Sequence, residues 1–219
     1  MVAVATVALN KSDQAFVDLE RLIVLQRLEP GTLVSEKQLM DLTGFGRTPV
    51  REAIQRLSRE RLLEIHPNRG VLVAPSSVET QLKLLELRRN LEPYAVRLAA
   101  SRATVAQREA ASELARTAIE SSNSIDNFAV FLRSAHALVV GATQNEYVEV
   151  AMAPLQGLSR RFWFAHMSDP ENDLAQAAGL HRDILSAIAH GDVDGATAAS
   201  TALSDYLIAF AYGTLPKQD

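Results

Sequence analysis

Cysteine is absent from this sequence of 219 residues, which excludes a disulfide framework and any thiolate metal site. No stretch approaches the roughly 20 apolar residues that a membrane-spanning helix needs. Even the richest stretch, 128–142, contains Arg133, Ser134 and His136. The apolar N-terminus has no basic segment before it, so it does not resemble a secretory signal, and we expect the first dozen residues to form a frayed tail. These absences predict a cytoplasmic protein without a membrane partner.

An excess of positive charge is also absent, since the formal net charge is −4. The charges are unevenly distributed, however. Residues 1–75 hold ten Lys and Arg against nine Asp and Glu, whereas residues 76–219 hold twelve against seventeen. The segment 47–69 alone carries six arginines and three glutamates. A basic patch on an acidic protein fits a nucleic-acid partner, although a patch of this size is also common on ordinary solvated surfaces.

Apolar spacing and turn residues divide the first 75 residues into short helices and a hairpin. The predicted elements are a helix from Asp13 to the breaker Glu29–Gly31, a helix after the capping box Ser35–Gln38 that ends at Thr43, a helix from about Thr48 to Arg61, and strands at 62–66 and 71–73. Thr48 is the expected N-cap of the third helix, with Pro49 at its first position, where a missing N–H costs nothing. This order predicts a winged helix-turn-helix domain over residues 1–75.

The segment Pro75–Ser77 is the expected domain boundary, and only helical periodicity follows it. Helices are expected near residues 78–101, 105–120, 125–142, 145–167, 171–190 and 193–212. Pro93 and Pro154 fall inside two of these helices and should kink them. The predicted fold class is therefore mainly α, with an all-helical bundle domain over residues 78–219.

The third predicted helix separates an apolar face from a polar one. Arg51, Gln55 and Arg59 recur on the polar face. An arginine at the start of such a helix can bond guanine O6 and N7 in the major groove, and the helix N-terminus also favours phosphate. The alternative is a solvated face in which these arginines pair with Glu52 and Glu60.

The N-terminal motifs resemble the DNA-binding domain of GntR-type transcription regulators. The resemblance rests on Leu28–Gly31, Ser35–Glu36, Gly46–Ala53, Arg56–Leu57 and Arg69–Gly70. It implies operator contacts at Arg47, Thr48 and Arg51, a backbone contact at Lys37, and a wing formed by Asn68, Arg69 and Gly70. Gln55, on the same helical face as Arg51, completes the predicted DNA-binding set. Family members often have serine at the position of Gly46, a difference that would remove one phosphate contact.

Residues beyond 76 resemble the FadR branch of that family, whose members carry an FCD-type effector domain. The resemblance rests on Glu86–Pro93, on Arg97–Ala100 and on the all-helical pattern. It implies a domain that dimerises the protein and binds a small molecule. Sensor domains of other GntR branches need β-strands or a much longer chain, so they are disfavoured.

In many FCD domains an aspartate and three histidines line a central cavity and hold a divalent metal, which binds a carboxylate effector. His136 and His181 match two of these positions, whereas Leu132 and Leu203 stand at the other two. Two imidazoles are a poor cage for a divalent ion, so we expect no tight metal and assign no cofactor. A divalent metal held by His136 and His181 is the alternative. Asp205 and Tyr206 lie within one turn of Leu203, so a small shift in the alignment with the family would place a polar ligand at the last position. If no metal is bound, the alternative is that His136 and His181 are ordinary core or surface histidines.

Arg88 is the other candidate effector ligand, beside His136 and His181, because many family members have an effector-contacting arginine at the matching place. A guanidinium binds a carboxylate through paired hydrogen bonds. The alternative for Arg88 is a surface ion pair with Glu92, four residues on. Arg160 and Arg161 adjoin the aromatic run 162–164, which is more typical of a core with arginines at its edge.

These observations predict a sequence-specific DNA-binding transcription regulator. We expect a repressor that binds double-stranded operator DNA as a homodimer and responds to a small organic acid. We expect no enzyme activity, since no nucleophile motif, phosphate-binding glycine loop or clustered carboxylate–histidine set is found. The rival hypothesis is a helical metal-dependent enzyme or ligand-binding module to which the N-terminal domain is only attached.

Overall fold

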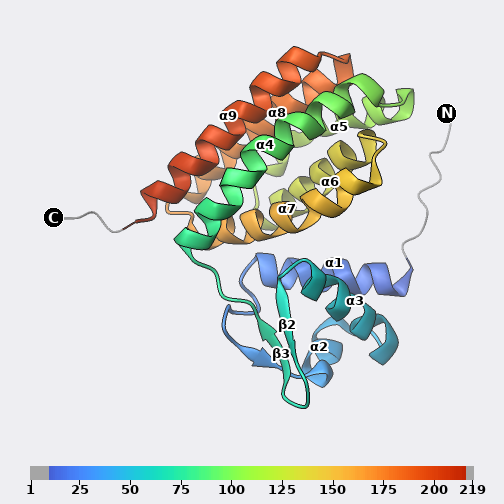
Figure 1. Cartoon of the computed structure of the whole chain (residues 1–219), viewed down its shortest axis with the longest axis vertical. Coiled ribbons are helices and arrows are strands. Elements are labelled where there is room, and N and C mark those ends of the chain that lie inside the picture. The colour runs from blue at the N-terminus through green and yellow to red at the C-terminus, as the bar shows by residue number, and fades with distance from the viewer. Residues whose placement is uncertain (1–9, 216–219) are drawn as a thin grey trace. The chain divides into compact units, whose positions relative to one another are not determined.

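The computed structural model describes residues 10–215, and the chain divides into two compact units between Pro75 and Ser76. The first unit combines helices with a small sheet, and the described part of the second, 76–215, contains helices only (Figure 1). The mainly α fold class predicted from the sequence is therefore confirmed.

The first unit, over residues 10–75, has three helices and a three-stranded antiparallel sheet. Its elements are α1 (Lys11–Val24), β1 (Leu33–Val34), α2 (Glu36–Thr43), α3 (Arg47–Arg59), β2 (Leu63–His66) and β3 (Gly70–Val73). Both α1 and α2 pack against α3, and β2 and β3 form the hairpin that follows it (Figure 1). This is the predicted winged helix-turn-helix arrangement.

Helix α1 differs from its prediction at both ends. The side chain of Asn10 caps the helix by accepting a hydrogen bond from the Asp13 N–H, so residues 10–12 are ordered rather than frayed. The rest of that predicted tail, 1–9, lies outside the described residues. At its other end α1 stops at Val24, well before Pro30, because Gln26 adopts a φ of 58° and leaves the right-handed helical region.

The turn between α2 and α3 is shorter than predicted, because α3 begins earlier in the chain than expected. Gly44 ends α2 in the left-handed region at a φ of 72°, which glycine adopts without strain. Gly46 is already the N-cap of α3, so the expectation of Thr48 as N-cap is wrong. The extended backbone of Gly46 starts the helix without any side-chain cap. Pro49 accordingly lies at the third helical position, where N–H groups still lack intrahelical acceptors.

Strand β1 was not expected from the sequence. It pairs with β3 in the register Leu33↔Leu72 and Val34↔Val71, which makes β3 the central strand of the sheet. Two residues are too short to show the alternation that identifies a strand. The capping box Ser35–Gln38, which was expected, follows directly and starts α2.

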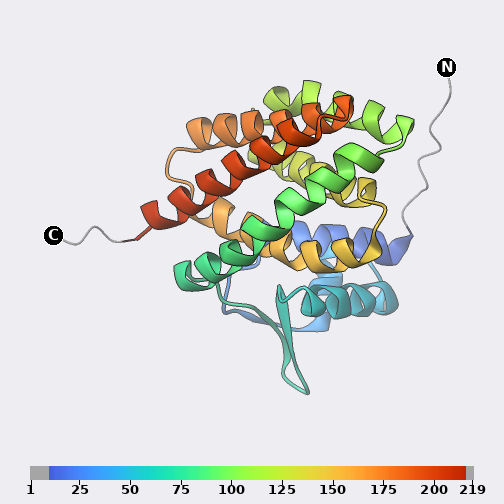
Figure 2. The same cartoon turned by 45° about the horizontal axis from the view of Figure 1, so that its top comes forward.

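The second unit contains six helices over residues 76–215. They are α4 (Val78–Arg102), α5 (Val105–Ser121), α6 (Ile125–Ala142), α7 (Glu146–His166), α8 (Pro170–His190) and α9 (Val193–Gly213). These bounds agree with the predicted ones to within one residue. Pro93 and Pro154 lie inside α4 and α7. Helix α4 lies beside α9 in both views and also packs against α6, α7 and α8 (Figures 1 and 2). Helix α4 therefore contacts four of the other five helices of this unit, and α8, which packs against α4, α5, α6 and α9, does the same.

Helix α6 is, within residues 10–215, the one helix long and apolar enough to cross a membrane by length and composition. Its mean hydropathy is 1.2 over 18 residues. Its buried residues include Phe128, Phe131 and Leu132, and it packs against α4, α5, α7 and α8. The apolar composition of α6 therefore matches its place in the helical core.

Candidate functional site

The outer face of α3 carries the side chains predicted to contact DNA. Arg47, Thr48, Arg51 and Gln55 are exposed, whereas Val50 is fully buried. Among residues 10–215, the side chains of Arg47 and Thr48 have no hydrogen bond or ion pair. The start of α3 thus presents polar donors that a phosphate or base edge would meet directly.

Arg51 makes an ion pair, but not with the glutamates of its own helix. Its Nε lies 3.4 Å from Oε1 of Glu36 in α2, and the two side chains are 63% and 42% exposed. Glu52 instead accepts a hydrogen bond from Ser12. An exposed pair of this kind contributes at most about 1 kcal/mol, so an external acceptor can replace Glu36 as the partner of Arg51.

One arginine of the basic segment has a structural role. Arg56 Nη1 lies 2.6 Å from Oδ1 of Asp13, and its guanidinium stands over the Phe16 ring, 4.1 Å from the ring centroid. These contacts join α3 to α1. The charge that this segment presents to solvent is therefore smaller than its arginine count suggests.

The wing tip exposes Asn68 and Arg69. Asn68 has a φ of 61° and Gly70 a φ of 116°. A Cβ on Gly70 would lie 2.6 Å from the carbonyl oxygen of Val34, so glycine is required there by the sheet itself, whatever it does at DNA. Lys37, the remaining predicted contact, is exposed in the first turn of α2.

The second unit has a small cavity of about 20 Å³, which is room for about one water molecule. Helices α4, α6, α7, α8 and α9 all contribute to its wall. The lining residues are Arg88, Leu132, His136, Ser159, Arg160, Trp163, Ala177, His181, Leu203, Tyr206 and Leu207. This is a mixed site in which an apolar wall surrounds a few buried polar groups.

All four positions of the family's metal set meet in this cavity. His136 and His181 line it together with Leu132 and Leu203, and the two imidazole centroids are 5.5 Å apart. The structure thus brings together residues that the resemblance placed on separate helices. Leu132 and Leu203, at the positions where the resemblance implies an aspartate and a third histidine, form part of the same wall.

The shifted alignment finds no support in the geometry. Asp205 pairs with Arg89 at 3.0 Å on the surface of the unit, where both side chains are more than half exposed. Tyr206 does line the cavity, but its hydroxyl accepts a hydrogen bond of 2.9 Å from Trp163 Nε1. The Asp205 carboxylate therefore lies outside the cavity, and Tyr206 brings a phenol to it rather than a carboxylate or an imidazole.

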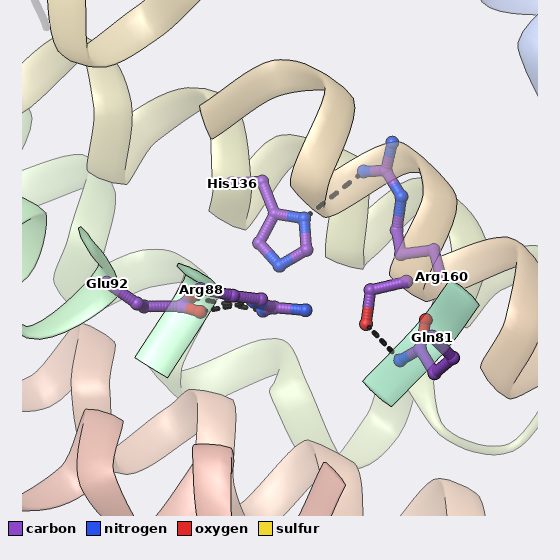
Figure 3. Close-up of polar contacts among 6 residues, drawn as sticks. Gln81, Arg88, Glu92, His136 and Arg160 are labelled. Atoms are coloured by element: carbon purple, nitrogen blue, oxygen red, sulfur yellow. Dashed lines mark hydrogen bonds and ion pairs between the residues drawn. The ribbon is translucent and has the colours of Figure 1, made fainter. Parts of the chain in front are cut away.

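Arg88 forms an ion pair and also lies at the cavity. It pairs with Glu92, with the Nη2–Oε1 contact at 3.1 Å and a second contact from Nε to Oε2. The expectation of a surface pair is wrong, since the two side chains are only 3% and 5% exposed. The guanidinium also borders the cavity, with His136 beside it (Figure 3). Arg88 is thus a buried cation whose side-on donors are held by an internal carboxylate.

Burial lowers the pKa of both cavity histidines. The pKa of His136 lies well below its ordinary value, because burial and then the charges of Arg160 and Arg88 disfavour the protonated ring. Burial likewise lowers the pKa of His181 to about 4, against the opposing effect of the Ala177 carbonyl. Both rings are therefore neutral at pH 7.

Arg160 is the site residue that sequence reasoning missed. It was expected at the edge of an aromatic core, yet it is buried, lines the cavity, and places Nη1 3.3 Å from Nδ1 of His136 (Figure 3). Ser159 lies beside it in the wall and accepts a hydrogen bond of 3.1 Å from Gln81 of α4. The one signal in the sequence was the arginine pair directly before an aromatic run, and that pair does not show which of the two arginines faces the cavity.

Family models match both units of the chain. The model for bacterial regulatory proteins of the gntR family matches residues 11–73, and the FCD domain model matches residues 83–205. The chain is also 32% identical over 199 residues to the HTH-type transcriptional repressor RspR of Escherichia coli, covering 87% of this chain and 84% of the relative. The chain belongs to the GntR family of bacterial transcription regulators. Its second unit is an FCD effector domain.

Other known proteins agree with this membership. The Nta operon transcriptional regulator of Aminobacter aminovorans is 31% identical over 147 residues, which is 67% of this chain and 69% of that protein. The solved structure of E. coli McbR/YncC matches with a TM-score of 0.74 at 19% identity, covering 94% of this chain and 98% of the other. That likeness shows a shared fold.

Proposed function

We propose that this GntR-family regulator acts as a cytoplasmic homodimer that binds a pseudo-palindromic operator through two copies of α3. A two-fold dimer presents its recognition helices to major grooves about one DNA turn apart. Arg51 reads a base edge, while Arg47 and Thr48 hold phosphate at the N-terminus of α3. The observation that supports this is the exposed row of polar donors at the start of that helix.

The cavity of the FCD domain is the proposed effector site, and a small organic acid is the proposed effector. Arg88 and Arg160 border it from α4 and α7, and each guanidinium is a strong donor to a carboxylate. Helix α4 begins at Val78, directly after the Pro75–Ser77 segment that leads from the first unit. An effector that binds one arrangement of α4 more tightly than another shifts the protein toward that arrangement. Operator affinity can then change by no more than the difference between the two effector-binding free energies. In our proposal this change weakens operator binding and relieves repression.

Operator binding is tested by fluorescence anisotropy with DNA fragments from the neighbourhood of the protein's own gene. We expect one fragment to bind at least a hundredfold more tightly than random DNA of equal length at the same salt concentration. Arg51→Ala should weaken that binding by about 5- to 150-fold, which corresponds to roughly 1–3 kcal/mol. Equal binding of every fragment would contradict the proposal.

Arg116→Ala is the matched control for the loss of one positive charge. Arg116 is exposed in α5 of the second unit, and within residues 10–215 its one ion pair is with Glu113. Its removal should leave operator affinity within twofold of the wild type. If both variants weakened binding equally, the effect of Arg51 would be one of net charge rather than of contact.

The rival hypothesis of a metal-dependent enzyme gains no support. Within residues 10–215, no group of three or more His, Cys, Asp or Glu side chains is placed to hold a metal ion. The cavity offers two histidines and two arginines instead. Its chemistry suits the binding of an anion.

A further inference from the structure

The two cavity histidines each use Nδ1 and leave Nε2 buried without a hydrogen-bond partner among the described residues. Nδ1 of His136 lies 3.3 Å from Arg160 Nη1. Nδ1 of His181 lies 2.8 Å from the carbonyl oxygen of Ala177. Unsatisfied polar atoms buried at a cavity are costly, and each one indicates what its missing partner must be.

The partners at Nδ1 determine the tautomer of each ring. A guanidinium has only N–H donors, so Nδ1 of His136 must accept from Arg160 and carries no proton. Because the ring is neutral, its single proton lies on Nε2. A carbonyl oxygen only accepts, so Nδ1 of His181 carries the proton and Nε2 has the lone pair. The two unpartnered Nε2 atoms are therefore a donor on His136 and an acceptor on His181.

Opposite tautomers do not fit a divalent metal. A metal ligates the lone pair of a histidine whose other nitrogen donates to a carbonyl or carboxylate, and His181 has that arrangement. His136 has the reverse, since coordination through its Nε2 would require the proton to move to Nδ1 and the Arg160 hydrogen bond to break. The guanidinium of Arg88 bordering the same space repels a cation further. The residues present therefore do not fit the metal that the family implies.

We infer that this cavity binds its ligand without a metal, through a hydroxyl group that accepts from His136 Nε2 and donates to His181 Nε2. A hydroxyl does both at once, whereas an ionised carboxylate only accepts. The adjacent guanidinium of Arg88, toward which the unbonded nitrogen of His136 points in Figure 3, suits an anionic group on the same molecule. The ligand class is thus a small hydroxycarboxylate. The anionic part of this class rests on the proposed effector function, whereas the hydroxyl rests on the tautomers alone.

The hydroxyl completes a directional chain of hydrogen bonds across three helices. The chain runs from Arg160 in α7 to His136 in α6, through the ligand hydroxyl to His181, and ends at the Ala177 carbonyl in α8. Every donor in it faces an acceptor.

The tautomers are measured directly by long-range ¹H–¹⁵N correlation NMR on the full chain labelled at its five histidines. His136→Asn and His181→Asn assign the two signals. We expect protonated Nε2 for His136 and protonated Nδ1 for His181 at pH 7. Arg160→Met should change the tautomer pattern of His136 and leave that of His181 unaltered. The same tautomer on both rings, or no response of His136 to Arg160→Met, would overturn the inference.

Metal binding is tested by titrating Mn²⁺ into the apo protein by calorimetry. The wild type should show no stoichiometric site. Leu132→Asp/Leu203→His introduces the family's two other ligands. Adding Arg160→Met to that variant should tighten Mn²⁺ binding by about 10-fold, because His136 Nδ1 can then carry the proton and leave the Nε2 lone pair for the metal. A stoichiometric wild-type site that shifts both histidine signals, or no effect of Arg160→Met in the restored variant, contradicts the inference.

The ligand class is tested with matched pairs, 2-hydroxybutyrate against butyrate and mandelate against phenylacetate, in the presence of EDTA. Quenching of Trp163, the one tryptophan of the chain, reports binding because its ring lines the cavity. At least one hydroxylated member should bind ten or more times more tightly than its partner. Equal binding within both pairs, or none in either, overturns the ligand class. Tight binding without any change in operator affinity would instead reject the proposed effector function and leave the ligand class standing.

Discussion

The two units of this regulator use the same kind of ion pair for opposite purposes. In the winged-helix unit, Arg51 and Glu36 meet at 3.4 Å with most of the arginine in solvent. In the FCD unit, Arg88 and Glu92 form a pair that is almost completely buried. Water and salt weaken the exposed pair, so its arginine is available to DNA. The buried pair cannot be separated without leaving a charge in the core, so it belongs to the structure of the site.

The largest expected effect comes from breaking the buried pair. Arg88→Met leaves Glu92 uncompensated and should destabilise the FCD unit by about 3–5 kcal/mol. The double variant Arg88→Met/Glu92→Leu should recover most of that loss, because no charge remains buried. Urea unfolding followed by Trp163 fluorescence measures this unit alone, since the chain has no other tryptophan. If Arg88→Met were as stable as the wild type, the buried pair would carry no structural role.

Lowering the pH should have the next largest effect, a loss of folding stability in the same FCD unit. His181 has a folded pKa of about 4, below the ordinary 6.5, so the unfolded chain binds its proton more readily. Stability should therefore be complete above about pH 6.5 and fall as the pH drops toward 4, by about 3 kcal/mol from this group. The charges facing it are Arg88 and Arg160, which lower the pKa, and Glu92, which raises it.

The control for the acid effect is His181→Leu, which removes the titrating ring and keeps the cavity filled. The difference in unfolding free energy between the wild type and His181→Leu should change between pH 7 and pH 5. A difference that stays constant over that range would mean that His181 is not buried as a neutral ring.

Removing Glu36 from the exposed pair should change operator affinity rather than the free energy of unfolding. Glu36→Gln removes the competitor of Arg51 and should tighten operator binding by a few-fold, on the order of 0.5 kcal/mol. The measurement is anisotropy at low and at moderate salt, and the gain should shrink as salt rises. Weaker binding in Glu36→Gln would show that Glu36 orients Arg51 for DNA instead of competing for it.

The smallest effect is expected at the start of α3. A Cβ on Gly46 meets no atom within 4 Å, and its φ is ordinary, so Gly46→Ser fits without strain. Serine at the N-cap would supply the side-chain hydrogen bond that glycine cannot make, and a hydroxyl donor to phosphate. We expect a few tenths of a kcal/mol of added stability and a modest gain in operator affinity. Gly46→Ala, which fits equally but cannot cap, is the matched control. Equal behaviour of the two variants would argue against the cap.

The fold could be predicted from local patterns where caps and periodicity agree. Helices begin at the expected places where Thr104, Gln107 and Asp192 cap the neighbouring backbone with their side chains. Helix α8 ends as expected at Gly191, because glycine adopts the left-handed conformation there without strain. The start of α3 was misplaced because Gly46 caps it by backbone geometry alone. Strand β1 escaped detection because it depends on β3, about 40 residues away.

The candidate site was predictable only in part. The positions of His136 and His181 followed from the family pattern, and the structure places them in one cavity. The role of Arg160 did not follow, because an arginine beside Phe162 and Trp163 gives no indication of which way it faces. The tautomers could not be predicted at all, since they depend on Arg160 and on the Ala177 carbonyl meeting particular ring nitrogens.

The small size of the cavity has a kinetic consequence. A space of about 20 Å³ admits one water but not an organic acid, so the wall must move before a ligand can enter. The observed association rate should then level off at high ligand concentration, at the frequency with which the wall opens. Release would be limited by the same opening. The regulator would in that way stay in its ligand-bound state for some time after the free ligand concentration has fallen.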